Sequence, residues 1–449
     1  MLISKLAEFS EKFDMLPKGS LVLAAVSGGR DSMCLLDALL TLAPKGGFSV
    51  AAAHFNHCLR GAESDGDEEF VREYCASRGV ACYIGRGDVK AEVENSGGGT
   101  EAVARRLRYA FLENAASSAG ASRIATAHNA DDNVETVLLN IARGSGLKGI
   151  CGIPPVRDRF VRPLLTVSRA EIDEYVKENS IPYRDDSTNS GDEYARNRIR
   201  HGVTPILAEI NPSLCENVAA MTALLREDEA FLDGLARKFI DENLHGRRMS
   251  AEKLLGEPRP VAARIIKIMC PASVDSRHVD AALRLCAAKN PSAIADLPGM
   301  RLRREYGDVV FGDETPHLDF PETELIAGSS VRIEELRLEI SCEKGLCDPN
   351  IYNSFTTFLF KNEAVCGKMV IRPRKSGDTI RLSERGGTKT LKKLFIEKRI
   401  PAAIRQHVPV IADDNGVAAV FGIGADIRFK PKPGDAVLKV TVKDMNKNE

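Results

Sequence analysis

The alternation of short apolar runs with amphipathic helical segments constrains the fold of this chain more than any other feature. Residues 21–26 are uninterruptedly apolar, which is typical of a strand buried on both faces, and an apolar stripe predicts a helix over 32–42. The same pairing recurs, with strands expected at 48–55, 81–84, 124–127 and 160–165 and helices at 67–77, 100–116, 131–143 and 169–179. Repeated βα units predict an α/β fold with a parallel sheet between helices.

The second half of the chain has a different texture. The pattern is helical from about 214 to 289, and short apolar runs with Gly and Pro follow from about 325, with strands expected from about 363. A length of 449 residues also suits two or three domains. We therefore expect an α/β domain with a parallel sheet at 1–213, a small helical domain at 214–325 and a small α+β C-terminal domain at 326–449.

Composition excludes several classes of protein. Lys and Arg number 62 against 63 Asp and Glu, and the hydrophobic share is 43%, so global disorder is not expected. The apolar runs are far shorter than the roughly 18 residues of a membrane span, and the first residues do not resemble a signal peptide. Eleven cysteines without a C-x-x-C pair favour reduced thiols and disfavour a zinc site. A cytoplasmic protein without a membrane partner is expected.

Charge is distributed unevenly along the chain. Residues 367–432 contain 15 Lys and Arg against 6 Asp and Glu, a local net charge of +9 in a chain of net −1. This basic block suits a polyanion such as RNA. A solvated surface with no ligand is the alternative.

The segment Ser27-Gly28-Gly29-Arg30-Asp31-Ser32, between the first strand and its helix, is the strongest chemical signal. Two glycines allow the backbone N–H groups to approach an anion, and the helix N-terminus favours negative charge. An aspartate beside phosphates is expected to act through a bridging Mg²⁺. The alternative is simple helix capping by Asp31 or Ser32. No Walker A pattern is present, and the G-x-G-x-x-G at 144–149 follows a helix, which disfavours a dinucleotide site.

Three further segments contain polar residues that could take part in a site. In the segment 128–136, Asp132 and Glu135 are three residues apart and can share a helical face, where they could hold a metal or a substrate ammonium. Their alternative role is to stabilise a helix N-terminus. Arg105 and Arg108 share a face of the helix at 100–116 and could bind phosphate, although a solvated basic face is the alternative. A polar stretch at 185–200 could contact RNA or fix the helical linker.

These motifs together resemble the PP-loop ATP pyrophosphatases and, within them, the tRNA(Ile)-lysidine synthase family. The S-G-G-x-D-S loop at 27–32 is the superfamily signature, and the blocks 56–60, 101–112, 128–136 and 194–200 match the family in order and spacing. The basic segments 372–378 and 391–395 extend the match to the C-terminal part. The resemblance is weakest between about 227 and 360.

The resemblance implies a two-step ligation. ATP adenylates O2 of the wobble cytidine in a tRNA(Ile) with a CAU anticodon and releases diphosphate; the ε-amine of free L-lysine then attacks C2 and expels AMP. Ser27, Gly28, Gly29, Arg30, Asp31 and Ser32 would bind ATP, with Mg²⁺ on Asp31. Arg105 and Arg108 would offset phosphate charge, and Asp132 and Glu135 would hold the lysine ammonium.

Two other functions stay open at this stage. A PP-loop tRNA thiolase activates a base in the same way but usually depends on paired cysteines, which this chain lacks. A tRNA-binding protein with a degenerate nucleotide fold would not need the intact loop at 27–32. The sequence does not decide whether the chain acts alone or as a homodimer.

Overall fold

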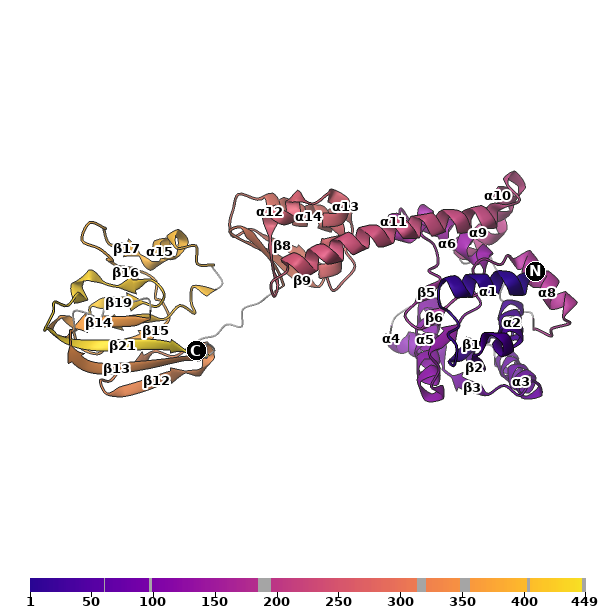
Figure 1. Cartoon of the computed structure of the whole chain (residues 1–449), viewed down its shortest axis with the longest axis horizontal. Coiled ribbons are helices and arrows are strands. Elements are labelled where there is room, and N and C mark those ends of the chain that lie inside the picture. Colours follow the sequence, from indigo (N-terminus) through magenta and orange to yellow (C-terminus); the bar gives the residue numbers. More distant parts are fainter. Residues whose placement is uncertain are drawn as a thin grey trace. The chain divides into compact units, whose positions relative to one another are not determined.

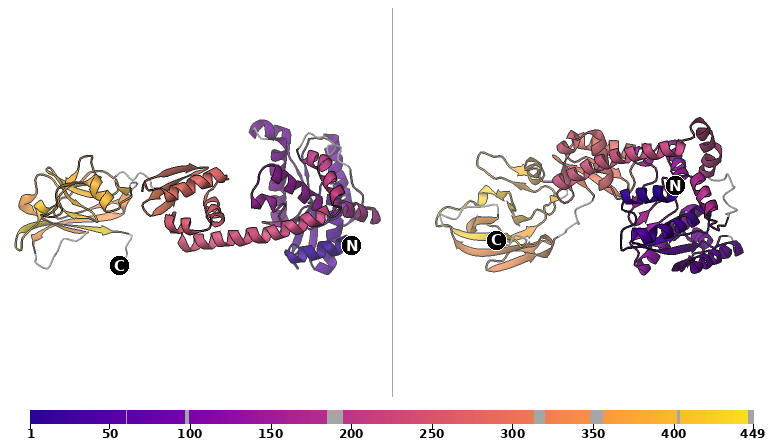
Figure 2. Two further views of the ribbon diagram at one scale, coloured as in Figure 1. Left: turned by 90° about the horizontal axis from the view of Figure 1, so that it is seen from above. Right: turned by 45° about the vertical axis from the view of Figure 1, so that its right-hand side comes forward.

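The computed structural model describes residues 1–59, 61–96, 99–184, 195–312, 320–347, 356–401 and 404–445. The chain divides into two compact units, 1–231 and 232–449, whose helices and strands are drawn in Figure 1. Each unit has hydrophobic cores of its own. Helix α11 (Leu214–Asn243) continues through the boundary between the units as one long helix (Figure 2).

A six-stranded sheet organises the first unit. Its strand order is β3-β2-β1-β4-β6-β5, and every neighbouring pair is parallel except β5 and β6. The expected α/β fold with a parallel sheet is confirmed. The strands are β1 (Leu21–Ala25), β2 (Ser49–Asn56), β3 (Cys82–Arg86), β4 (Arg123–Ala125), β5 (Val156–Arg157) and β6 (Phe160–Val161).

Helices cover both faces of this sheet because successive side chains of a strand point to opposite faces. Val22 and Ala24 of β1 belong to the core formed with α1, α2, α3 and α8, whereas Leu23 belongs to the core formed with α5. The helices are α1 (Leu2–Lys12), α2 (Arg30–Gly46), α3 (Ala62–Ser77), α4 (Val89–Ser96), α5 (Thr100–Ala119), α6 (Ala130–Ala142), α7 (Leu147–Ile150), α8 (Arg169–Glu178), α9 (Ala195–Gly202) and α10 (Thr204–Ile210).

The local signals explain where the main helices begin and end. Ser168 and Glu171 form a capping box at the start of α8, and Asn129 and Asp132 form another at the start of α6. Helix α2 is longer than expected, since it continues through Pro44 to a left-handed Gly47. Pro44 lies in the last turn and removes only one helical hydrogen bond, which the chain tolerates there.

The first part of the second unit is helical, as expected, and also contains a sheet. Helices α12 (Ala251–Gly256), α13 (Arg259–Met269) and α14 (Ser276–Ala287) share a core with an antiparallel sheet of order β7-β10-β9-β8. The sequence did not predict this sheet, because arginines alternate with apolar residues along β9 and make it look polar. The strands are β7 (Arg248–Ser250), β8 (Ile294–Leu297), β9 (Met300–Glu305) and β10 (Asp308–Phe311).

The last part of the chain is mainly antiparallel β structure. Strands begin well before the expected 363, because β12 and β13 are half-exposed and therefore lack long apolar runs. The boundaries expected at 213 and 325 remain predictions. The elements are β11 (Thr323–Glu324), β12 (Ser329–Ile333), β13 (Leu338–Leu346), β14 (Thr357–Lys361), β15 (Val370–Arg372), β16 (Thr379–Ile380), β17 (Lys389–Thr390), α15 (Leu391–Glu397), β18 (Val410–Asp413), β19 (Gly416–Val420), β20 (Gly424–Ala425) and β21 (Ala436–Asp444).

Two expectations from composition can be compared with the structure. All eleven cysteines are free, in agreement with the absence of paired cysteines in the sequence. No helix in the described part of the chain combines the length and apolar character that crossing a membrane requires.

Candidate active site

The strand order brings the sequence motifs to one edge of the sheet. Strand β1 lies between β2 and β4: the chain first adds β2 and β3 on one side of β1 and then returns to add β4 on its other side. In parallel sheets, ligands bind outside the carboxyl ends of the strands at the point where the strand order reverses in this way. The glycine loop follows β1, His57 follows β2, His128 follows β4 and Arg162 follows β6.

The glycine loop is held by its own hydrogen bonds. The Ser32 hydroxyl donates to the Gly29 carbonyl oxygen at 2.8 Å and accepts from the Ser27 N–H at 3.1 Å. Gly28 has φ +90°, a left-handed conformation that L side chains rarely adopt. Gly29 is the N-cap of α2 and has no side chain to accept from the first-turn N–H groups. The backbone of the loop is therefore already arranged so that its N–H groups can bind an anion.

Asp31 faces the start of α6 from the first turn of α2. Asn129 Nδ2 donates to Asp31 Oδ2 at 3.1 Å, and the Arg169 guanidinium lies 3.6 Å from the same oxygen. Burial raises the pKa of Asp31; Arg169 acts against this shift, and the Asp132 carboxylate adds to it. Its charge is therefore incompletely compensated within the protein.

This environment fits a divalent cation shared with phosphate oxygens. Among the described residues, no three His, Cys, Asp or Glu side chains are grouped closely enough to hold a metal alone. Mg²⁺ in nucleotide sites commonly uses one or two carboxylates together with substrate phosphates and water. Asp31 can supply such a ligand.

Asp132 and Glu135 lie on one face of α6, as their spacing predicts, and α9 covers them. Arg196 donates to Asp132 Oδ1 at 3.1 Å and to Glu135 Oε2 at 2.8 Å. Arg200 donates to Glu135 at 2.5 and 2.9 Å and to Asp132 at 3.4 Å. The Glu135 side chain is only 2% exposed, and that of Asp132 is 14% exposed. The two carboxylates and two arginines form one compensated group.

Some motif residues lie elsewhere or outside the described part of the chain. Arg30 pairs with Asp173 at 2.6 Å and its guanidinium lies 4.7 Å from the centroid of the Tyr183 ring, which directs it toward α8. His57 packs edge-on against Phe55. Arg60, the stretch 185–189 and Tyr194 fall outside the described residues.

Arg105 and Arg108 lie beside Tyr109 on α5. The Arg105 guanidinium donates to the Tyr109 hydroxyl at 3.0 Å and lies 4.7 Å from the ring centroid, and Arg108 lies 5.8 Å from it. Arg157 lies 5.7 Å from the same centroid, and Arg162 also interacts with the Tyr109 side chain. We call these four arginines around Tyr109 the arginine cage.

Comparisons with known proteins identify the family to which this chain belongs. A PP-loop domain matches residues 2–207, and a TilS substrate C-terminal domain matches residues 369–442. A tRNA(Ile)-lysidine synthase of Geobacillus kaustophilus is 32% identical over 437 residues, which cover 92% of this chain and 93% of the relative. One of Solibacter usitatus is 33% identical over 446 residues, covering 95% and 99%. The chain belongs to the tRNA(Ile)-lysidine synthase family.

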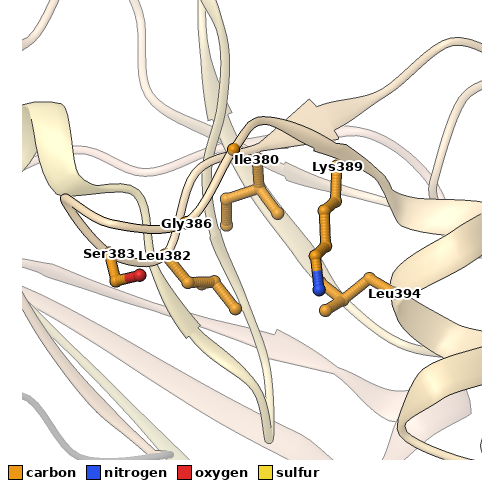
Figure 3. A pocket seen from close by; sticks show the side chains of 7 residues that line it. Ile380, Leu382, Ser383, Gly386, Lys389 and Leu394 are labelled. Atoms are coloured by element: carbon orange, nitrogen blue, oxygen red, sulfur yellow. The ribbon is translucent and has the colours of Figure 1, made fainter.

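The match to a TilS substrate C-terminal domain at residues 369–442 extends the family relationship to the C-terminal part. A crystal structure of a TILS C-terminal domain is 25% identical, with a TM-score of 0.26, and the match covers 28% of this chain and 98% of that structure. In the present chain, Arg372 and Asp378 form a buried pair with two contacts of 2.9 Å, whereas Lys392 and Lys393 are exposed on α15. A small pocket between Ile380, Leu382 and Leu394 opens beside Lys389 (Figure 3).

Several site residues of this family member were not predicted from the sequence. Asn129 and Arg169 both contact Asp31, and Arg157 and Arg162 join the cage. The N-cap position of Asn129 and the capping box beside Arg169 were visible in the sequence, but neither indicates a partner on α2. Arg196 and Arg200 were noted only as part of a basic stretch, and the structure pairs them with the carboxylates of α6.

Proposed function

We propose that this chain forms lysidine at the wobble cytidine of a tRNA(Ile) with a CAU anticodon, using ATP and free L-lysine and releasing AMP and diphosphate. Membership of the tRNA(Ile)-lysidine synthase family over nearly the whole chain carries this proposal. The glycine loop, Asp31 and the carboxylates of α6 at one edge of the sheet support it. We place the reaction in the cytoplasm.

The first step makes the cytidine O2 a leaving group. O2 attacks the α-phosphorus of ATP, the bond to the diphosphate breaks, and C2 becomes joined through oxygen to AMP. Ser27, Gly28, Gly29 and Ser32 would bind the phosphates through N–H and hydroxyl groups, and Arg105 and Arg108 would offset their charge. Asp31 would hold a Mg²⁺, which polarises phosphate oxygens when bound. Arg30 would support the loop through Asp173 rather than touch ATP.

The second step needs a neutral lysine amine. The ε-ammonium loses a proton, its nitrogen attacks C2, and the C2–O bond breaks to release AMP. Asp132 is the more exposed of the two α6 carboxylates, so we assign it the contact with the ammonium and its proton. Glu135 is almost fully buried against Arg196 and Arg200 and would fix that group in place.

The remaining parts of the chain would bind the tRNA. We propose a catalytic domain at 1–213, a linker domain at 214–325 that contacts tRNA and a basic C-terminal domain at 326–449. The exposed Lys392 and Lys393 and the match to a substrate C-terminal domain support the last assignment. Phosphate contacts of this kind position an RNA without reading its sequence.

The deciding experiment measures incorporation of labelled lysine into a tRNA(Ile) transcript with CAU, in the presence of ATP and Mg²⁺. We expect lysine transfer with one AMP and one diphosphate per lysine. Folded protein that binds the transcript and hydrolyses ATP without lysine transfer would contradict the proposed nucleophile. Protein that binds the transcript without consuming ATP would contradict an enzymatic role.

A further inference from the structure

The arginine cage concentrates positive charge in a small volume. Arg105, Arg108 and Arg157 lie within 5.8 Å of the centroid of the Tyr109 ring, and Arg162 interacts with the same side chain. Burial lowers the pKa of Arg162; Tyr109 acts against this shift, and Arg157 and Arg105 add to it. Burial also lowers the pKa of Arg108; Tyr109 opposes this shift, and Arg105 adds to it. The cage arginines therefore repel one another.

No acidic side chain compensates this charge within the described ranges. None of the four arginines has a carboxylate within 4 Å there, although most other arginines of the first unit are paired in this way. Tyr109 contributes a hydroxyl and a ring face, which are weaker partners than a carboxylate. An isolated group of four cations is costly unless an anion occupies it.

Arg162 is the most constrained member of the cage. It is only 2% exposed, and one Nη donates to the Pro154 carbonyl oxygen at 2.6 Å. Its buried Nε has no hydrogen-bond partner among the described residues. A buried guanidinium with an unused donor, placed just after β6 at the ligand edge of the sheet, is a feature that a bound oxyanion would satisfy.

The cage adjoins the rest of the candidate active site through His128. Burial, followed by Arg162, Arg108 and Arg196, lowers the pKa of this histidine to about 3. His128 follows β4, and Arg196 contacts Asp132 on α6. His128 is thus near both the cage and Arg196 as a neutral side chain, and it adds no further positive charge at neutral pH.

We propose that Arg157 and Arg162, on the β5–β6 hairpin, complete with Arg105 and Arg108 a second phosphate site, separate from the glycine loop. The identity of the bound phosphate rests on the proposed function. The existence of the site rests on the cage geometry alone. Two sources share this chemistry: the diphosphate part of ATP and a backbone phosphate of the RNA beside the target cytidine. Guanidinium groups bind either one through paired N–H donors.

Arg157 is the best residue for a test, because it is exposed and its guanidinium lies beside the Tyr109 ring without an ion pair to any described residue. Arg157→Gln removes one cage charge with little risk to folding. Lys45→Gln is the matched control, since exposed Lys45 lies in the last turn of α2, shortly before β2 begins and thus at the opposite edge of the sheet. Binding of inorganic diphosphate, and of a 17-nucleotide anticodon stem-loop over a range of salt, should be measured calorimetrically for both variants.

We expect Arg157→Gln to weaken one of the two ligands about tenfold while Lys45→Gln changes neither. Weaker diphosphate binding assigns the site to ATP. Weaker stem-loop binding, with a log–log salt slope reduced by about 0.7–0.9, assigns it to the RNA backbone. Unchanged binding of both ligands would overturn the proposal. Because the readout is binding, a protein that fails to form lysidine would still give a result.

A second variant tests the buried member of the cage. Arg162→Lys keeps the charge but loses the planar donor set, so the same ligand should bind more weakly, again by about tenfold. Its thermal unfolding, measured in parallel, separates a folding defect from a binding defect. A folded Arg162→Lys protein with normal affinity for both ligands would remove Arg162 from the site.

Discussion

At the scale of single residues, Asp31 has a charge that its surroundings do not fully compensate. Burial and Asp132 raise its pKa against the opposing effect of Arg169. An acid whose pKa is raised by folding destabilises the protein at any pH where it is ionised, and this destabilisation disappears as the pH falls below the folded-state pKa. The cost suits a residue retained for ligand binding.

Asp31→Asn should therefore separate activity from stability. We expect the variant to release no AMP in the presence of tRNA, because it loses the metal-binding charge, and to have a higher Tm than the parent at pH 7 without ligands. Release of AMP, with thermal unfolding by calorimetry, provides the measurement. Asp241→Asn, at an exposed position of α11, should leave both quantities unchanged. Normal AMP release by Asp31→Asn would remove this residue from the site.

His128 gives a second prediction at this scale. Its folded-state pKa of about 3 lies below the ordinary value of 6.5, because burial and nearby arginines disfavour the proton. The unfolded chain therefore binds a proton first as the pH falls, and stability is lost between about pH 6.5 and 3. His128→Gln should flatten the dependence of Tm on pH in this range. Parallel Tm curves for the parent and the variant would contradict the lowered pKa.

At the scale of elements, the glycine loop owes its shape to one backbone conformation. A Cβ at Gly28 would meet Phe70 and Val71 at 3.5 Å, which is an ordinary van der Waals contact. The cost of Gly28→Ala therefore comes from the backbone angle φ of +90°, and the free energy of unfolding should fall by about 1–2 kcal/mol. Gly120→Ala is the matched control: φ is +70°, and a Cβ would meet nothing within 4 Å. Urea unfolding should show a similar decrease in the free energy of unfolding for both variants, whereas only Gly28→Ala should raise the KM for ATP. A normal KM would exclude the loop from ATP binding.

The contact of α9 with α6 depends on a buried ionic group. Glu135→Gln leaves Arg196 and Arg200 without their most buried partner. We expect the free energy of unfolding to fall by about 2 kcal/mol. This is less than for a fully buried pair, because both arginines are partly exposed. Urea denaturation measures the change. Glu113→Gln, on the exposed face of α5, should change stability by less than about 0.5 kcal/mol. Equal losses in the two variants would show that the ionic group does not fix α9.

At the scale of the whole molecule, the basic block of the C-terminal part is not uniformly available to RNA. Arg372, Lys375 and Lys389 are paired with Asp378, Glu322 and Glu397. Lys392 and Lys393 instead lie exposed on α15. The electrostatic contribution to tRNA binding should therefore come from a subset of the 15 basic residues.

The double variant Lys392→Gln/Lys393→Gln tests this subset. We expect weaker tRNA binding and a log–log salt slope reduced by about 1.5, because two phosphate contacts are lost. Lys344→Gln/Lys443→Gln removes the same charge from exposed positions of β13 and β21 and should have little effect. Filter binding over a salt series compares the two. An equal change in both double variants would mean that only net charge matters.

Much of this protein is predictable from local sequence patterns. The apolar run of β1, the glycine loop after it and the capping box of α8 each lie within a few neighbouring residues, and the structure contains all three. The spacing of Asp132 and Glu135 places both on one helical face for the same reason. Strands β9 and β12 were not predicted, because buried and exposed residues mix along them and a half-exposed strand resembles a polar loop in sequence.

The amino-acid sequence by itself therefore determined the α/β character of the first half, its strand-to-helix loop and the residue types available for chemistry. Only the tertiary structure decided their partners: Asn129 on Asp31, 98 residues away, and Arg200 on Glu135, 65 residues away. The physical reason is that periodicity reports which face of an element is buried, whereas strand order and helix docking decide which distant side chains meet. The arginine cage, assembled from α5 and the β5–β6 hairpin, exists only at that level.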